Sequence, residues 1–210
     1  MPADTEAPPA IRPPTVRARH AASLVVWQRE PDAIAVLMGM RGARHRFMPN
    51  KLVFPGGAVD PSDKTAAVAT PLSPSTRAAL ERSANPALAQ ALAVAAAREL
   101  EEETGLTLGR PPKLDGLHYL CRAITPPSLP IRFNARFLAV SAAHVSGTIA
   151  GGGELEELRF YSLRELHAFD LAWITREILD IFERWLPLSD DERLARTAFP
   201  VCRRQRWSSE

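Results

Sequence analysis

The sequence has few cysteines, no long apolar run and almost no net charge. Its two cysteines among 210 residues, Cys121 and Cys202, are too few for a disulfide framework and fit a reducing compartment. No apolar run approaches the roughly 20 residues that a membrane-spanning helix needs, and the N-terminal residues lack the apolar core of a secretory signal. We therefore expect a cytoplasmic protein with no membrane partner.

The formal net charge of +2 gives no support for a nucleic-acid partner. Nucleophilic catalysis by serine or cysteine also lacks support, because no G-x-S-x-G motif occurs and neither cysteine has a histidine beside it. What the chain does contain is a 46% share of hydrophobic residues, enough for a sizeable core. Its length suits one domain with insertions or tails.

The two ends of the chain differ from its centre. Residues 1–17 hold five prolines and little apolar periodicity, which predicts a disordered or extended arm, either solvated or partner-binding. Residues 201–210 contain the basic run CRRQRW and are expected to form a basic tail that is solvated or contacts an anionic ligand. Residues 18–200 between them form the predicted single domain.

Most of the predicted strands lie in two groups that a helical region separates. Apolar runs predict strands at 21–30, 33–41, 51–57, 117–125, 131–140 and 158–162. The first two strands are expected to pair, and the third ends in a Pro-Gly-Gly turn.

One predicted helix has clear start and stop signals. Asn85 is a favourable cap, Pro86 a favourable first residue, and Gly105 follows Thr104 as a C-terminal stop. Further helices are predicted over 163–170 and 171–186, and a short one at 75–83 within an insertion at 64–85. Strands, a helix, more strands and final helices together predict an α/β sandwich with a mixed sheet.

The end of the long helix carries several acids in five positions. Glu99, Glu102 and Glu103 fall on one helical face, where like charges repel by roughly 0.2–0.5 kcal/mol per pair. A hard divalent cation shared by these carboxylates would cancel that repulsion, whereas the alternative is a solvated acidic helix end. Arg98, four residues before Glu102, is close enough to brace a carboxylate. We call these three glutamates the acidic stripe.

The acidic stripe lies in a string that resembles a known family motif. The segment RELEEETGL, from Arg98 to Leu106, is similar to the second half of the Nudix box, R-E-U-x-E-E-x-G-U with U aliphatic. The first half of that box is G-x5-E, and here Gly57 is followed by five residues and then Asp63 in place of the glutamate. The family has seven residues before the arginine, whereas 34 residues separate Asp63 from Arg98. The box is therefore interrupted, at little cost, because loop-closure entropy grows only logarithmically with length.

The resemblance implies a fold and a metal site. The fold would be a Nudix-type α/β/α sandwich with a mixed β-sheet and a loop–helix–loop that binds Mg²⁺ or Mn²⁺. Glu99, Glu102, Glu103 and the Gly56 carbonyl would be the metal ligands, and Arg98 would orient Glu99 or Glu102. Asp63 is one methylene shorter than the family's glutamate, so a water-mediated contact with the metal is easier to accept than a direct one.

The family reaction is hydrolysis of a nucleoside diphosphate linked to another group, and it needs a general base. Some members take the base from the box, which here makes Glu99 and Glu102 catalytic candidates with Arg98. Others use a glutamate in a later loop, and GGGELEELRF at 151–160 offers Glu154 directly after three glycines. Glu154 is therefore a predicted late ligand or base, with an exposed loop acid as the alternative.

A finer resemblance concerns the substrate. Coenzyme A-cleaving Nudix enzymes, including a peroxisomal diphosphatase with an interrupted box, carry L-L-T-x-R-[SA]-x3-R-x3-G-x3-F-P-G-G before the box. The positions that keep this spacing here are Leu37, Arg41, Arg46, Phe54, Pro55, Gly56 and Gly57, and those that depart from it are Met38, Gly39, Gly42 and Asn50. Arg41, Arg46, Phe54 and Gly57 are thus predicted substrate contacts, although both arginines have solvated positions as the alternative.

These resemblances imply a metal-dependent coenzyme A or acyl-CoA diphosphatase that releases 3′,5′-ADP and (acyl-)phosphopantetheine. The alternatives are a Nudix pyrophosphatase for ADP-ribose, dinucleotides or nucleotide sugars, and a Nudix-like binding module without activity. The expected partner is a small CoA-like nucleotide, with no nucleic acid and no membrane. A homodimer is left open.

Overall fold

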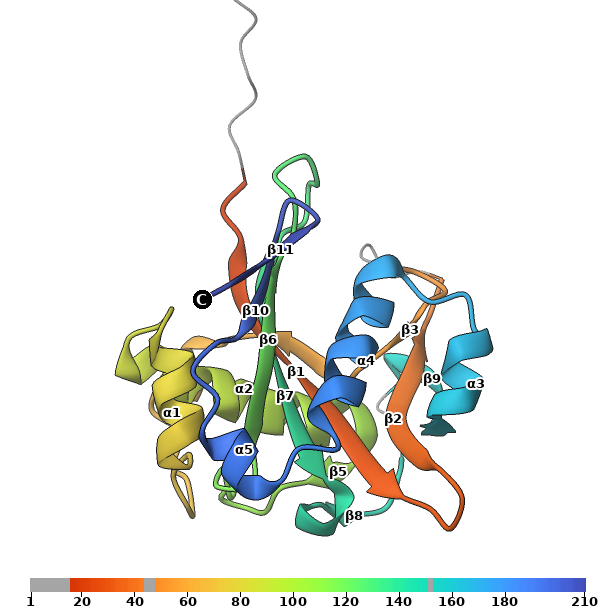
Figure 1. The fold of residues 1–210 in the computed structure, drawn as a ribbon, viewed down its shortest axis with the longest axis horizontal. Coiled ribbons are helices and arrows are strands. Elements are labelled where there is room, and N and C mark those ends of the chain that lie inside the picture. Colours follow the sequence, from red (N-terminus) through yellow and green to blue (C-terminus); the bar gives the residue numbers. More distant parts are fainter. Residues whose placement is uncertain (1–15, 44–47, 151–152) are drawn as a thin grey trace, which may run out of the picture.

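A large mixed sheet forms the centre of the computed structural model (Figure 1), which describes residues 16–43, 48–150 and 153–210. The strands are β1 (Arg19–Arg29), β2 (Ile34–Arg41), β3 (Leu52–Val53), β4 (Gly56–Ala58), β5 (Leu106–Thr107), β6 (His118–Ile124), β7 (Phe133–Ser141), β8 (Ser146–Gly147), β9 (Leu155–Ser162), β10 (Pro200–Arg203) and β11 (Arg206–Ser209). The helices are α1 (Pro74–Glu81), α2 (Pro86–Thr104), α3 (Leu163–Ala168), α4 (Trp173–Trp185) and α5 (Asp190–Leu194), with short 3-10 turns η1 (Pro61–Lys64) and η2 (Ala142–His144).

The strand order of this sheet is β11-β10-β6-β7-β1-β2-β3, with β4 beside β1 and β9 beside β2. The β1–β7 and β6–β10 pairs are parallel and the others antiparallel. Helices α1 and α2 cover one face of the sheet, and α3 and α4 cover the other (Figure 1). The predicted α/β sandwich with a mixed sheet is therefore confirmed. Within the described ranges, no helix is long and apolar enough to cross a membrane.

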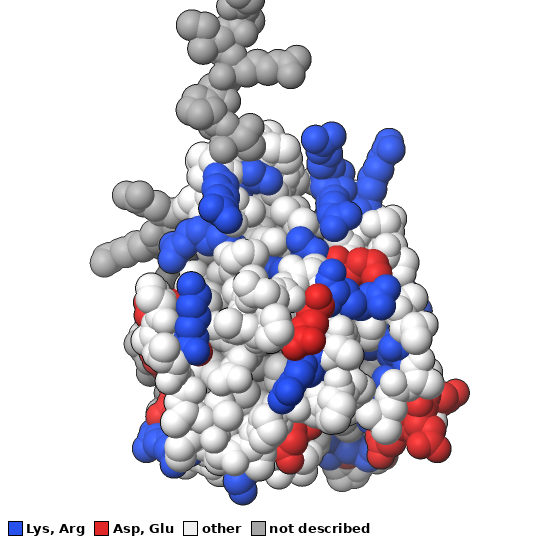
Figure 2. All heavy atoms as spheres, turned by 90° about the vertical axis from the view of Figure 1, so that its left-hand side faces the viewer, with Lys and Arg blue, Asp and Glu red and all other residues white. Residues whose placement is uncertain are grey.

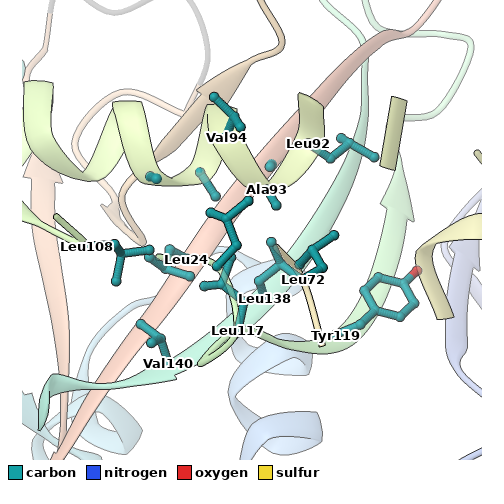
Figure 3. Close-up of a cluster of buried hydrophobic side chains, with 14 of the residues drawn as sticks. Leu24, Leu72, Leu92, Ala93, Val94, Leu108, Leu117, Tyr119, Leu138 and Val140 are labelled. Carbon is teal, nitrogen blue, oxygen red and sulfur yellow. The ribbon is translucent and has the colours of Figure 1, made fainter. Parts of the chain in front are cut away.

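Helix α2 begins and ends where the sequence predicts. The Asn85 side chain accepts a hydrogen bond from the Leu88 amide, Pro86 opens the first turn, and Gly105 closes the helix with a left-handed φ of 74°. Its buried residues include Ala93 and Leu92, which belong to the same hydrophobic cluster as Leu24 and Leu138 of the sheet (Figure 3). This packing fixes the direction in which the polar end of α2 points.

The insertion is part of the core and not only a surface loop. Leu72, Ala79 and Leu80 are buried in the same hydrophobic cluster as α2 and the sheet. Burying each leucine side chain contributes about 1.5–3 kcal/mol. The insertion therefore helps to hold the helix that carries the acidic stripe.

The C-terminal prediction is wrong in one respect. Residues 201–210 are not a solvated tail, because they belong to a β-hairpin, Pro200–Ser209, that adds two strands to the sheet beside β6. Val201 and Cys202 are buried, and the Glu210 carboxylate receives a hydrogen bond from Arg122 at 2.8 Å. The basic residues hide the strand pattern in the sequence, since charged side chains are common on edge strands.

Charges of both signs are spread over the surface that α1 and α2 form. Figure 2 shows lysine and arginine side chains gathered near the upper edge of this face, with acidic side chains mostly below them. The mixture agrees with the small net charge of the whole chain.

Candidate metal and substrate site

The Pro-Gly-Gly turn lies directly against the acidic end of α2. Gly56 has φ 155°, and a Cβ there would meet the Ala22 carbonyl oxygen at 2.5 Å. A Cβ on Gly57 would lie 2.2 Å from the Glu99 Oε1 atom. Only glycines therefore let the helix carboxylate approach this turn so closely.

Asp63 and Arg98 meet across the insertion. The Arg98 Nε and Nη2 atoms donate to the two Asp63 oxygens at 3.0 and 3.1 Å, and Asp63 is 1% exposed. Asp63 also accepts from the Asp60 amide at 2.7 Å, which completes the capping box of η1. The hydrogen bond to Asp63 raises the pKa of Arg98 above its usual range, and the hydrogen bond to Glu99 contributes a smaller increase. Asp63 thus occupies the position of the missing glutamate as a partner of Arg98.

Arg98 also holds two members of the acidic stripe. Its Nη1 atom donates to Glu99 at 2.8 Å and to Glu102 at 3.0 Å. Burial raises the pKa of Glu99 above its ordinary value, with the Arg98 hydrogen bond acting in the opposite direction. One guanidinium therefore connects the buried Asp63 to two carboxylates of the acidic stripe.

Glu103 is the most buried member of the stripe, at 3% exposure. It accepts a hydrogen bond from the Gly56 amide at 2.8 Å, and an Arg41 nitrogen lies 3.9 Å from its other oxygen. Burial raises the pKa of Glu103 to about 7, against the opposing effects of the Gly56 amide and Arg41. The buried Nε atom of Arg41 has no hydrogen-bond partner among the described residues.

Glu154 comes near the same place from another part of the chain. It precedes β9, whose first residue, Leu155, pairs with Arg41. The charge of Glu154 raises the pKa of both Glu99 and Glu103, so its carboxylate lies within electrostatic reach of the stripe. The structure therefore brings the predicted late-loop glutamate toward the box.

The residues present have the right chemistry for a hard divalent cation. Several carboxylate oxygens gather beside a glycine turn, and oxygen ligands of this kind suit such a cation. Over the described ranges, however, no three His, Cys, Asp or Glu side chains are arranged so that they could hold a metal ion. In this structure Arg98 binds Glu99 and Glu102, and the Gly56 amide N–H, rather than its carbonyl, contacts Glu103.

A cavity of about 380 Å³ opens beside this cluster, between the sheet and the start of α4. We call it the α4 cavity. Arg41, Gly56 and Gly57 form the wall that it shares with the acidic stripe. Phe54 lies in the wall and meets Phe137 edge to face, with ring centroids 6.2 Å apart. Arg41, Phe54 and Gly57 are thus placed together at one cavity.

One predicted substrate contact has no described position, and several residues of the cavity wall were not predicted. Arg46 lies outside the described residues, so the structure gives it no position. Sequence reasoning missed Trp173 and Leu129 on the cavity wall, and it also missed the small side chains of its floor. The sequence offers one signal for these contacts, which is the tryptophan at position 173 near the start of the predicted helix 171–186.

Comparisons with known proteins now identify the fold. Residues 89–182 match the NUDIX domain family. The chain has the Nudix fold. The structure of the Nudix hydrolase from Alicyclobacillus acidocaldarius is similar with a TM-score of 0.61 and 25% identity, covering 80% of this chain and 91% of that one. The Nudix match and this hydrolase neighbour support a pyrophosphohydrolase.

More distant structures share the Nudix fold. The MutT protein from Methanosarcina mazei Go1 has a TM-score of 0.53 at 17% identity, covering 81% of this chain and 96% of that one. The NUDIX domain of Shewanella oneidensis NrtR, solved with ADP ribose, has a TM-score of 0.50 at 16% identity, covering 87% and 94%. At these identities the likeness shows the fold alone. The comparison with curated proteins gives no match.

Proposed function

We propose that this Nudix protein is a metal-dependent diphosphatase for coenzyme A or acyl-CoA, producing 3′,5′-ADP and (acyl-)phosphopantetheine. The coarser statement, a Nudix hydrolase acting on nucleoside diphosphate derivatives, rests on the domain match and the fold neighbours. The observation that carries the proposal is the contact between the acidic stripe and the glycine turn: Glu103 accepts a hydrogen bond from the Gly56 amide, and Gly56 also lines the α4 cavity.

Each residue of the cluster has a distinct role in this proposal. Glu99, Glu102 and Glu103 would hold the metal, with the Gly56 carbonyl as a further ligand. A bound Mg²⁺ or Mn²⁺ supplies charge neutralisation at the diphosphate and lowers the pKa of a coordinated water. Asp63 fixes Arg98, and Arg98 fixes the direction of two of the carboxylates.

The remaining charged groups act on the substrate and the water. Glu154, in the loop before β9, would accept the proton of the attacking water in this proposal. Arg41 lies between Glu103 and the cavity, where its partly unsatisfied guanidinium can donate to a phosphate oxygen. A substrate that lies in the cavity would thus present its diphosphate to both groups.

The choice of coenzyme A rests on two supports. The spacing of Leu37, Arg41 and Phe54–Gly57 follows the signature of coenzyme A-cleaving Nudix enzymes. The structure places Arg41, Phe54 and Gly57 around one cavity whose walls are mostly apolar. Coenzyme A carries a long flexible arm on its diphosphate, which suits such a cavity better than a second sugar with its many hydroxyl groups would.

The test is product analysis by mass spectrometry. The purified protein would be incubated with Mg²⁺ or Mn²⁺ and a panel of coenzyme A, acyl-CoAs, NADH, ADP-ribose and diadenosine polyphosphates. We expect 3′,5′-ADP from the coenzyme A compounds and none after Glu102→Gln. Glu101→Gln is the matched control, because Glu101 pairs with Arg110 and does not belong to the stripe.

A second candidate is an ADP-ribose pyrophosphatase. The observation that favours it is the likeness to the NrtR domain, which was solved with ADP ribose. Cleavage of ADP-ribose alone, sensitive to Glu102→Gln, would keep the mechanism and replace the substrate. Binding of these nucleotides without any cleavage would instead favour a binding module without activity.

A further inference from the structure

The floor of the α4 cavity is a row of small side chains that crosses four neighbouring strands. Cys202 pairs with Ala123, Ala123 with Ala135, and Ala135 with Ala21. Residues that pair directly across a sheet point to the same face, and all four line the cavity. We call this row the small-residue trough.

The trough has a larger side chain on each side of it. Phe133 and Phe137 lie two residues before and after Ala135 on β7, on the same face of the sheet, and both line the cavity. The start of α4 covers the trough with Trp173, Ile174 and Ile178. The hollow therefore exists because one row of the sheet carries one-carbon or thiol side chains between rows that carry rings.

The small-residue trough runs from the glycine turn beside the acidic stripe to the C-terminal hairpin. At one end β4 pairs with β1, and its Gly56 and Gly57 form the wall shared with the acidic stripe. At the other end lies the C-terminal hairpin, where Gln205 lines the cavity at a left-handed φ of 60°. From Ala21 on β1 to Cys202 on β10 the row crosses four strands, or about 14 Å at the usual strand spacing.

The lining is poor in hydrogen-bonding groups. Apart from Arg41 at the diphosphate end, the described lining side chains that can form hydrogen bonds, besides the Cys202 thiol and the Trp173 indole N–H, are Ser23, Thr125, Thr175 and Gln205. The hydroxyl of Thr125 already accepts from the Phe133 amide at 3.0 Å. A purine would leave its polar edge largely unpaired in this space, whereas a linear chain with few polar groups would not.

We infer that the small-residue trough holds a linear, largely apolar arm attached to the diphosphate of the substrate, with the nucleotide part outside it. Under the proposed function, on which this inference rests, that arm is the acyl-pantetheine arm. Trp173 and Leu129 line the cavity and are each 45% exposed, so they lie at its rim, where the arm would cover them. Ala21, Ala123 and Ala135 are then the residues that determine specificity.

The two halves of the substrate provide the test. Octanoyl-pantetheine carries the arm without a diphosphate, and 3′,5′-ADP carries the nucleotide without the arm. Binding of each to the full chain would be measured by isothermal titration calorimetry for the wild type, Ala135→Leu and Ala123→Val. Ala87→Leu, an exposed alanine on α2, is the matched control.

We expect Ala135→Leu to weaken octanoyl-pantetheine binding about tenfold or more, since excluding two methylenes from an apolar site forfeits roughly that factor. The smaller Ala123→Val change should weaken it less, and 3′,5′-ADP binding should change by less than about twofold in both variants. Circular dichroism checks the fold, and a cavity-filling leucine should be tolerated. Ala87→Leu should bind both compounds as the wild type does.

The other outcomes separate the two proposals. If Ala135→Leu weakens 3′,5′-ADP instead, or if the wild type does not bind octanoyl-pantetheine, the trough does not hold the arm and the inference is overturned. The hydrolysis proposal would then stand or fall by the cleavage panel alone. If octanoyl-pantetheine binds and Ala135→Leu blocks it, but no coenzyme A compound is cleaved, the proposed function fails while the trough keeps its assignment.

Discussion

Both faces of the central sheet bury a hydrophobic cluster, but the α4 face also leaves a hollow under the start of its helix. On the α2 face, Leu24, Leu138 and Val140 fill the space under the helix (Figure 3). On the α4 face, their neighbours Ala21 and Ala135 leave a cavity of about 380 Å³ under the helix start. Strand residues alternate between faces, so one strand supplies both a filled core and a hollow. The filled face sets stability, and the hollow face is free to set recognition.

The largest expected effect tests the filled face. Leu92→Ala should lower the free energy of unfolding by about 2–5 kcal/mol, because it leaves a cavity in a fully buried cluster. Urea denaturation followed by circular dichroism measures it. Leu129→Ala, on the exposed rim of the hollow face, is the matched substitution and should cost less than about 0.5 kcal/mol. Equal losses would mean that the two faces do not differ in this way.

The next prediction concerns α2, which packs on one face of the sheet and carries the acidic stripe at its end. Asp63→Asn removes the charge that holds Arg98, so Glu99 and Glu102 lose their fixed positions. We expect metal affinity or turnover to fall about 10–100-fold. Metal titration and initial rates measure this. Asp63→Glu restores the residue that the Nudix box usually carries and should recover most of the loss, whereas equal damage by both changes would indicate a packing role only.

The C-terminal hairpin contributes residues to both faces of the sheet, and we expect a smaller loss of stability from a substitution there. Glu210 bonds Arg122 at 2.8 Å on one side, while Cys202 and Gln205 of the same segment line the cavity on the other. Glu210→Gln should cost about 1 kcal/mol of unfolding free energy, since it weakens a charge-assisted hydrogen bond. Thermal unfolding measures the cost. A variant as stable as the wild type would show that the backbone pairing of the hairpin suffices.

The smallest prediction concerns the packed end of α4. Burial, with a further effect from Arg193, lowers the pKa of His118, which packs against Trp185 with ring centroids 5.2 Å apart. The folded state therefore prefers the neutral ring, and its stability is complete above the unfolded pKa of about 6.5 and declines as the pH falls below it. Unfolding by urea at several pH values measures this decline. His118→Gln should flatten it, and an unchanged slope would assign it to other groups.

Local signals in the sequence predicted the parts of this structure that depend on neighbours along the chain. Asn85, Pro86 and Gly105 act within one turn of α2, so its limits could be predicted. The helical spacing of Glu99, Glu102 and Glu103 likewise placed the stripe on one side of the helix. The order of strands and helices was enough for the sandwich.

The trough and the hairpin could not be predicted in this way. Ala21 and Ala135 become neighbours only through the register of two strands that lie far apart in the sequence. Alanine has no strong preference that would mark a cavity floor. The hairpin combines buried Val201 with exposed arginines, and its partner β6 is equally distant along the chain.

The interrupted box has a consequence for how the site forms. Lengthening the loop between Asp63 and Arg98 from seven to 34 residues costs roughly 1.4 kcal/mol in closure entropy. Burial of Leu72 and Leu80 in the core returns more than this, at about 1.5–3 kcal/mol each. The segment between the two halves of the motif thus packs into the same core as the helix that carries the acidic stripe, so damage to that core would reach the chemical centre without any change in its own residues.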